Sequence, residues 1–107
     1  MKFTTLIPKT RNDGTPFLKH LLDRVIEGLW KPFGAMSQEG EVIGRWTHEG
    51  IVHSDLCIKI SIECSRDRLQ EAIRAVQRAG RKLRQKAMYF EVTGYDGVQI
   101  LALGKTH

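Results

Sequence analysis

The stretch GRWTHEGIVHSDLCIKISIEC, residues 44–64, contains two runs in which apolar and polar side chains alternate, with a turn between them. Such alternation is typical of β-strands with one buried face. Residues 48–50, HEG, end in a glycine, which adopts the positive φ of a tight turn without strain. We therefore predict a β-hairpin made of strands over residues 41–47 and 51–63.

The longer strand divides its side chains between two faces. The apolar face carries Val52, Leu56, Ile58, Ile60 and Ile62, and the polar face carries His53, Asp55, Cys57, Lys59, Ser61 and Glu63. A three-residue turn at 48–50 places Trp46 beside Val52 on the core face and leaves Arg45 near His53 and Asp55 on the outer face. A two-residue turn shifts this register by one residue. The hydrophobic pattern favours the three-residue turn.

A helix is predicted before the hairpin. Thr15 is a suitable N-cap, and Pro16 suits the first helical position. Apolar residues between positions 17 and 29 recur at spacings of three and four, which produces one apolar stripe. Pro32 and Gly34 end this helix.

The rest of the chain predicts a second helix and three more strands. Ser65 is an N-cap for a helix of about twenty residues, and Gly80 lies in its apolar stripe, where a close approach or a kink is possible. Residues 2–7 are β-branched and apolar, as in a strand. Residues 88–94 and 98–103 form a further hairpin around the turn signal Asp96-Gly97.

This order of elements defines the expected fold class. Strand, helix, strand, strand, helix, strand and one extra C-terminal strand predict a ferredoxin-like α+β sandwich (βαββαβ plus one strand), with two helices on one face of an antiparallel sheet. The chain has 107 residues, so we expect a single domain over 1–107. The sequence does not determine whether the last strand pairs within this sheet or with the sheet of a second subunit. Since the other sheet face is uncovered, a homodimer is expected.

Three phrases carry a resemblance to a known family: LIPKTRNDGTPF, LWKPFGAMS and GRWTHEGIVHSDLCIKISIE, together within residues 5–64. They resemble an uncharacterised family of small bacterial proteins in which an N-D-G turn, an F-G-G step and a G-x-W strand followed by an aspartate recur. The resemblance implies a ferredoxin-like fold and implies no activity. The chain departs from the pattern at Ala35, where the family has a second glycine.

Several functional classes are disfavoured by the composition. No run approaches the ~20 apolar residues of a membrane span, so we expect a cytoplasmic protein without membrane contact.

Cys57 and Cys64 fall on opposite faces of one strand, so we expect free thiols. His53, Asp55 and Cys57 alternate on one face, yet zinc sites draw ligands from two elements at tighter spacings. Neither a metal, a cofactor nor a catalytic residue is therefore predicted.

The formal net charge of +5 is concentrated in one segment. Residues 66–86 carry eight Lys and Arg residues against two acidic ones, and the rest of the chain is nearly neutral. The residues predicted to form an outward basic ridge are Arg74, Arg78, Arg81 and Lys82. Arginine binds phosphate with a planar fork, so a nucleic acid or an acidic protein is the expected partner. The same ridge is also compatible with a merely solvated helix face.

Two functional hypotheses follow. The favoured one is a non-enzymatic binding module, homodimeric, that contacts its partner through the basic helix or the open sheet face. The alternative is a small enzyme or ligand-binding domain that uses the outer sheet face around Arg45, His53 and Asp55. Exchange of the ridge arginines for glutamate distinguishes them, because it abolishes only the first activity.

Overall fold

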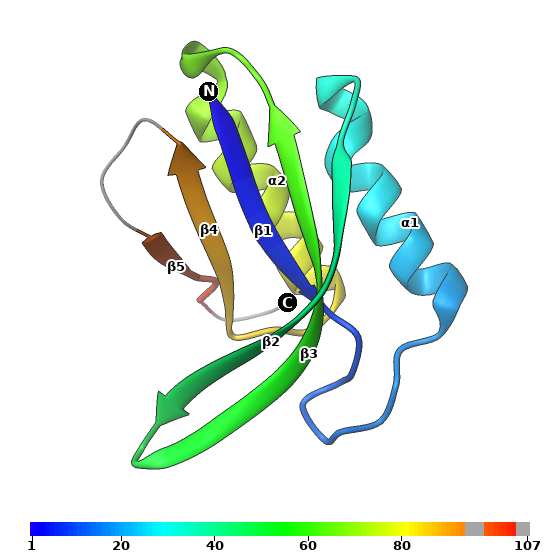
Figure 1. The fold of residues 1–107 in the computed structure, drawn as a ribbon, viewed down its shortest axis with the longest axis vertical. Helices are drawn as coiled ribbons and strands as arrows, with labels where there is room; N and C mark the ends of the chain where they lie inside the picture. Colours follow the sequence, from blue (N-terminus) through cyan, green and yellow to red (C-terminus); the bar gives the residue numbers. More distant parts are fainter. Residues whose placement is uncertain (94–97, 105–107) are drawn as a thin grey trace.

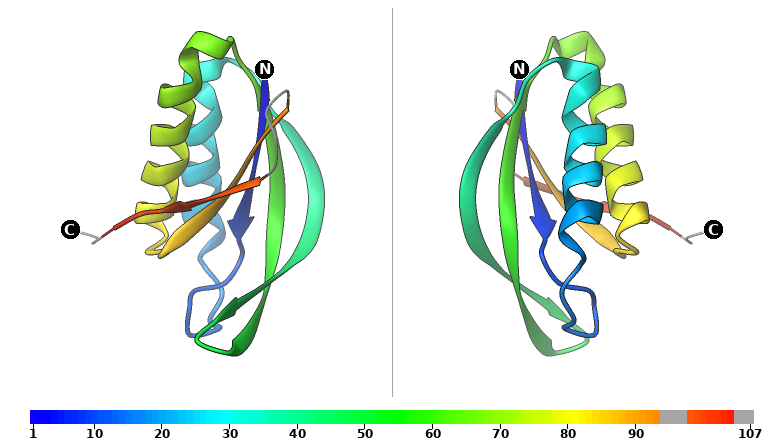
Figure 2. Two further views of the ribbon diagram at one scale, coloured as in Figure 1. Left: turned by 90° about the vertical axis from the view of Figure 1, so that its left-hand side faces the viewer. Right: turned by 90° about the vertical axis from the view of Figure 1, so that its right-hand side faces the viewer.

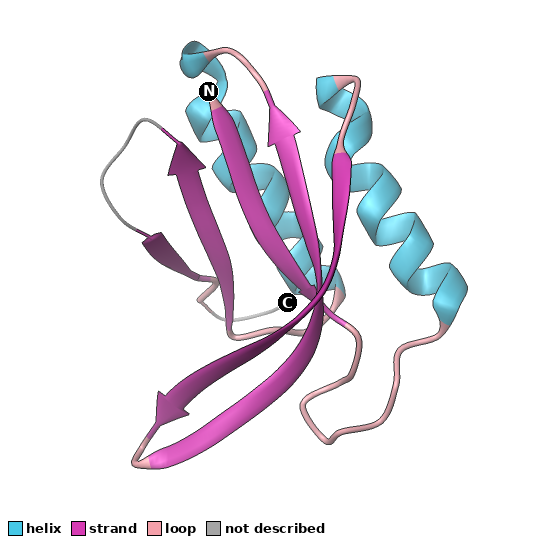
Figure 3. Ribbon diagram, in the orientation of Figure 1, coloured by secondary structure: helices cyan, strands magenta, loops and turns pink. Residues whose placement is uncertain are grey.

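The computed structural model describes residues 1–93 and 98–104 and contains one five-stranded antiparallel sheet with two helices on one face (Figures 1 and 3). The elements are β1 (Lys2–Pro8), α1 (Lys19–Trp30), the 3₁₀ turn η1 (Lys31–Phe33), β2 (Ser37–His48), β3 (Ile51–Glu63), the 3₁₀ turn η2 (Arg66–Arg68), α2 (Leu69–Lys82), β4 (Ala87–Thr93) and β5 (Val98–Ala102). The predicted α+β class with both helices on one face is confirmed.

The sheet has the strand order β2-β3-β1-β4-β5. β5 pairs with β4 in the same sheet, which answers the question of the last strand. Because of this fifth strand the arrangement is not a plain ferredoxin-like fold. The predicted turn at Asp96-Gly97 lies outside the described residues. Figure 2 shows both helices on one side of the sheet, so the opposite sheet face has no layer over it.

The core lies between the sheet and the helices. Phe3, Ile60 and Phe90 are fully buried on the strands, and the Phe3 and Phe90 rings stack with centroids 5.6 Å apart. α2 contributes mainly small buried residues, Ala72, Ala75, Val76, Ala79 and Gly80. This small-residue face brings α2 close to β4, whose Met88 is also buried.

The two helices begin later than the sequence predicts. Asp13 accepts hydrogen bonds from both the backbone N–H and the hydroxyl of Thr15, so Thr15 closes a loop turn instead of capping a helix. α1 therefore starts at Lys19, after Leu18, which has extended backbone angles. Ser65 makes no side-chain cap either, and a 3₁₀ turn precedes a helix of 14 residues, shorter than the expected twenty.

The predicted hairpin exists, but its predicted register is wrong. Glu49 and Gly50 have φ values of 51° and 78°, and two consecutive positive φ values define a two-residue type I′ turn. His48 pairs with Ile51, and consequently Trp46 pairs with His53 instead of Val52. Arg45 pairs with Ser54 and lies on the face opposite His53 and Asp55. β2 also begins at Ser37, four residues earlier than expected.

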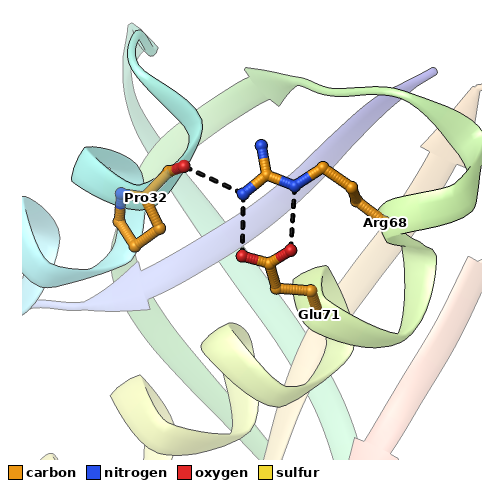
Figure 4. A network of polar contacts seen from close by, with 3 residues as sticks. All are labelled: Pro32, Arg68 and Glu71. Atoms are coloured by element: carbon orange, nitrogen blue, oxygen red, sulfur yellow. Dashed lines mark hydrogen bonds and ion pairs between the residues drawn. The ribbon is translucent and has the colours of Figure 1, made fainter.

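Arg68 joins the start of α2 to the end of α1 (Figure 4). Its guanidinium donates two hydrogen bonds, of 2.8 and 2.7 Å, to the Glu71 carboxylate and a third, of 2.9 Å, to the Pro32 carbonyl. The same group lies 4.5 Å from the centre of the Phe33 ring. This contact fixes η1 against the helix layer. Within the described part of the chain, neither helix has the length and apolar character needed to cross a bilayer.

Candidate functional site

A shallow depression of about 200 Å³ lies on the open face of the sheet. Its lining residues come from four neighbouring strands: Thr4 and Leu6 from β1, Val42 from β2, Lys59 from β3, and Tyr89 and Glu91 from β4. A mixed lining of apolar, aromatic and oppositely charged side chains is typical of small-molecule sites. Sites that enclose drug-sized ligands measure about 300–1,000 Å³, so a ligand bound here keeps one side exposed.

The register of the strands places a cation and an anion on either side of β1. Lys59 on β3 pairs with Leu6, and Glu91 on β4 pairs with Thr4. Neighbouring strands lie about 4.8 Å apart, and the two pairing positions on β1 are about 7 Å apart along the strand, so the Cα atoms that carry these two charges are about 12 Å apart. The apolar Leu6 and Val42 lie among them. The depression therefore has a cation on one side of β1, an anion on the other, and apolar side chains between them.

Polar contacts hold the floor of the depression in place. The buried hydroxyls of Thr4 and Ser61 hydrogen-bond each other at 2.9 Å. A hydrogen bond from Ser61, helped by the charges of Lys2 and Lys59, holds the pKa of Glu39 below its ordinary value. Glu39 therefore stays ionised at neutral pH and adds a second carboxylate to this side of the sheet.

Tyr89 is anchored through its backbone and keeps its phenol protonated. Its carbonyl accepts a 2.7 Å hydrogen bond from the hydroxyl of the fully buried Thr5. Partial burial and the neighbouring Glu91 carboxylate raise the pKa of the Tyr89 phenol. The phenol therefore acts at neutral pH as a hydrogen-bond donor and an aromatic surface, not as a base.

Cys57 lies beside the depression on β3 and is unsuited to nucleophilic chemistry. Burial, and secondly the charge of Asp55, raise the pKa of its thiol to about 11. Cys57 as a whole residue is only 6% exposed. Both cysteines are unbridged, as predicted.

The structure brings two of the three predicted ligand residues together. The His53 ring stacks on Trp46 with centroids 4.4 Å apart, and the Trp46 indole N–H donates a 2.9 Å hydrogen bond to Asp55. Arg45, predicted as their neighbour, is on the other face of the hairpin. The Trp46–His53–Asp55 cluster lies toward the tip of the hairpin, and none of its members lines the depression.

The predicted basic ridge is exposed on the helix layer. Arg74, Arg78, Arg81 and Lys82 all have exposed side chains. Lys82 also lines a charged groove of about 520 Å³ beside α1, with Asp23, Glu27 and Lys31 among its other walls. Among the described residues that line this groove there is no Phe, Tyr or Trp, and the helix layer lies on the far side of the sheet from the depression (Figure 2). A binding role for these four basic residues stays a prediction.

Sequence reasoning did not select the residues that line the depression. Strand alternation correctly put Lys59 and Ser61 on the outer face. Only the pairing of β3, β1 and β4 places Lys59, Thr4 and Glu91 side by side, and strand order is a tertiary property. Among the described residues there is no group of three or more His, Cys, Asp or Glu side chains that could hold a metal ion.

The fold class defined above, an α+β domain with two helices on a five-stranded sheet, has solved counterparts. A phage SAM lyase in its apo state superposes with a TM-score of 0.61 at 13% sequence identity, covering 99% of this chain and 91% of the lyase. A phage SAM lyase in complex with S-methyl-5′-thioadenosine gives a TM-score of 0.60 at 10% identity, covering 94% of this chain and 88% of the lyase. The chain therefore shares the fold of these lyases. No family model and no curated protein matches its sequence.

This likeness corrects the favoured functional hypothesis. We predicted a non-enzymatic binding module, whereas solved structures that match nearly the whole chain are enzymes. The finding favours the alternative hypothesis, a small enzyme or ligand-binding domain. The depression over β1 lies on the same face of the sheet as His53 and Asp55.

Proposed function

We propose that this chain is a small enzyme that binds S-adenosylmethionine in the depression on the open sheet face and cleaves it to S-methyl-5′-thioadenosine. One observation carries the proposal: the fold matches SAM lyases over 99% of the chain. The character of the depression supports it, since Lys59 and Glu91 offer opposite charges around an apolar floor.

The chemistry of the substrate fits the lining residues. S-adenosylmethionine carries a carboxylate, an ammonium, a sulfonium cation and an aromatic base. The Lys59 ammonium is a partner for the carboxylate, and the Glu91 carboxylate is a partner for either cation. The Tyr89 ring provides a surface for stacking the base or for holding the sulfonium by a cation–π contact.

The product defines the bond that breaks. S-methyl-5′-thioadenosine lacks the four-carbon amino-acid chain of S-adenosylmethionine, so cleavage occurs between that chain and sulfur, and the bonding electrons stay on sulfur. The carbon that loses them takes an electron pair from within the same chain: either its own carboxylate closes a lactone, or a neighbouring C–H bond becomes a C=C bond and its proton passes to a base. The cationic sulfur becomes a neutral thioether. A partly apolar floor such as Leu6 and Val42 favours this loss of charge relative to bulk water.

The proposal is tested by incubating the purified protein with S-adenosylmethionine and measuring products by liquid chromatography and mass spectrometry. We expect S-methyl-5′-thioadenosine together with an amino-acid fragment lighter by one water than hydrolysis would give. Removing one charge-assisted contact costs ~10-fold or more, so Glu91→Gln and Lys59→Met should lower the rate by at least ~10-fold. Glu27→Gln on α1 is the matched control and should retain full activity. Absence of product, or equal loss in the control, contradicts the proposal.

Two further expectations belong to this proposal. A homodimer, predicted from the sequence, remains part of it, with the restriction that the second copy leaves the open sheet face accessible to the ligand. A cytoplasmic location also remains part of it, and the two unbridged thiols support a reducing compartment.

A further inference from the structure

The outward face of α2 carries cationic side chains and almost no acidic ones. Four exposed residues form the basic ridge predicted from the sequence: Arg74, Arg78, Arg81 and Lys82. Glu71 is the one acidic residue in the sequence of α2, and its carboxylate already accepts two hydrogen bonds from Arg68. Four basic residues against one acidic residue give this helix a net charge of +3.

The acidic residues of the neighbouring helix do not neutralise the ridge. α1 lies beside α2 in the helix layer (Figure 2), but Asp23 pairs with Lys19 at 2.9 Å and Glu27 pairs with Lys31 at 2.7 Å, both within α1. Within the part of the chain that the structure describes, no ridge side chain makes an ion pair. Such a row of cations creates a positive potential that attracts polyanions.

The length of the ridge matches the width of a DNA groove. Arg74 and Lys82 are eight positions apart, which corresponds to about 12 Å along a helix axis at about 1.5 Å per residue. The major groove of B-DNA is about 12 Å wide and has a row of phosphates along each side. A helix that lies across this groove therefore brings the cations at its two ends to both phosphate rows.

The side chains of α2 discriminate between the anionic partners that the sequence left open. Protein interfaces have centres that are depleted in charged residues and enriched in aromatic ones, whereas the neighbours of the ridge on this face, Gln70 and Gln77, are polar. Single-stranded nucleic acids are held largely by stacking on aromatic rings, and α2 contains no Phe, Tyr or Trp. Duplex RNA has a deep, narrow major groove that side chains do not enter. Duplex DNA therefore fits this surface best.

We propose that the basic ridge is a binding surface for duplex DNA, which it holds through the phosphates without reading the base sequence. Three of its four cations are arginines, whose planar fork hydrogen-bonds a phosphate through two N–H groups at once. Phosphate contacts fix position on the duplex and carry no sequence information. The ridge lies on the far side of the sheet from the depression over β1 (Figure 2). DNA on α2 therefore leaves the open sheet face free, and this binding is independent of the proposed enzymatic activity.

The proposal is tested by fluorescence anisotropy with a labelled DNA duplex of about 20 base pairs over a range of salt concentrations. Each phosphate contact contributes about −0.9 to the slope of log K against log salt, so four contacts predict a slope of about −3 to −4. Arg78→Glu should weaken binding at least ~10-fold at low salt. Arg45→Glu on β2, the same change of charge outside the helix layer, is the matched control and should retain the wild-type slope. Absence of binding at about 50 mM salt, or an equal loss in the control, overturns the proposal.

A milder double variant keeps the test independent of folding. R74Q/R81Q removes two ridge charges with little change in helix propensity, so it should keep the circular dichroism spectrum of the wild type. Its salt slope should be smaller in magnitude by about 2, and an unchanged slope contradicts the assignment. Cleavage of S-adenosylmethionine should be unaffected, because neither arginine lines the depression.

Competition experiments identify the class of polyanion. Unlabelled duplex DNA, an RNA duplex of the same sequence, a DNA single strand and poly-glutamate are each added at equal charge concentration to the complex with labelled duplex. We expect duplex DNA to displace the label at the lowest concentration, because only its major groove matches the length of the ridge. Equal or stronger competition by any of the other three polymers overturns the assignment of duplex DNA as the partner.

Discussion

The absence of a side chain at Gly80 sets how closely α2 approaches the sheet. A Cβ atom there would lie 2.6 Å from Met88 Cγ and 2.7 Å from Leu103 Cδ1, inside normal contact distance. Both neighbours are buried, so neither can move without disturbing the core. Glycine in the middle of a helix costs about 1 kcal/mol relative to alanine, and here that cost is offset by packing.

We therefore expect Gly80→Ala to lower the free energy of unfolding by about 1–3 kcal/mol, the usual cost of overpacking a core. The comparison is Gly28→Ala on α1, where a Cβ would meet only the Lys82 ammonium at 4.0 Å. That change should stabilise the protein by up to about 1 kcal/mol. Urea unfolding of the two variants measures both. Equal effects of the two substitutions would refute the packing argument.

The thiol of Cys57 should be nearly inert. A pKa of about 11 against an ordinary value of 9.0 leaves ~100-fold less reactive thiolate at pH 8. We expect iodoacetamide to modify Cys57 in the native protein at least ~100-fold more slowly than in the urea-unfolded protein. Its native rate should rise about tenfold per pH unit up to pH 11. Fast labelling at pH 8 would contradict the burial of this side chain.

The hairpin shows why strand faces were easier to predict than pairing. Alternation placed His53 and Asp55 on the outer face correctly, because the period of a strand is fixed by its geometry. Register was inferred from hydrophobicity, which assumed that Trp46 and Val52 are both buried. In the structure Val52 is 66% exposed. The apolar side chains near the hairpin tip are exposed in the structure. Because they were assumed to be buried, the wrong turn length was chosen and Arg45 was placed on the wrong face of the hairpin.

The turn itself provides a test of the observed register. Glu49 is a non-glycine residue with φ of 51°, and asparagine tolerates this conformation better. We expect Glu49→Asn to stabilise the protein by about 1 kcal/mol and Gly50→Ala to destabilise it by about as much. Thermal unfolding of both variants measures the effects. A three-residue turn, as predicted from the sequence, would give no stabilisation by Glu49→Asn.

The helices illustrate a limit of local sequence signals. Thr15, Pro16 and Ser65 have the residue types of helix starts, yet the side-chain bonds to Asp13 close a loop before α1, and a 3₁₀ turn precedes α2. The apolar stripes, by contrast, identified both helices and their buried faces, because burial against the sheet dominates helix stability.

At the scale of the whole chain, the composition and the order of elements were sufficient to predict the α+β class and the uncovered sheet face. They did not predict the function that we propose. The basic charge of residues 66–86 led us to predict a binding surface on the helix layer. The depression that we propose as the ligand site lies on the other side, and its lining residues become neighbours only through the strand order β2-β3-β1-β4. Lys59 and Glu91 are 32 positions apart in the sequence, and no local motif connects them.

The most direct test of the proposed site is a titration of the isotope-labelled protein with S-methyl-5′-thioadenosine, followed by backbone amide chemical shifts. We expect the largest saturable shifts at Thr4, Leu6 and Tyr89, which line the depression and offer contacts to the uncharged adenosyl and thioether groups, with none on the exposed face of α2. The Glu91→Gln variant should retain the same pattern and a similar affinity for this product, because the product lacks both cations that Glu91 is proposed to contact. Shifts confined to the helix layer, or no saturable shifts at millimolar ligand, would contradict the assignment of the open sheet face as the ligand site.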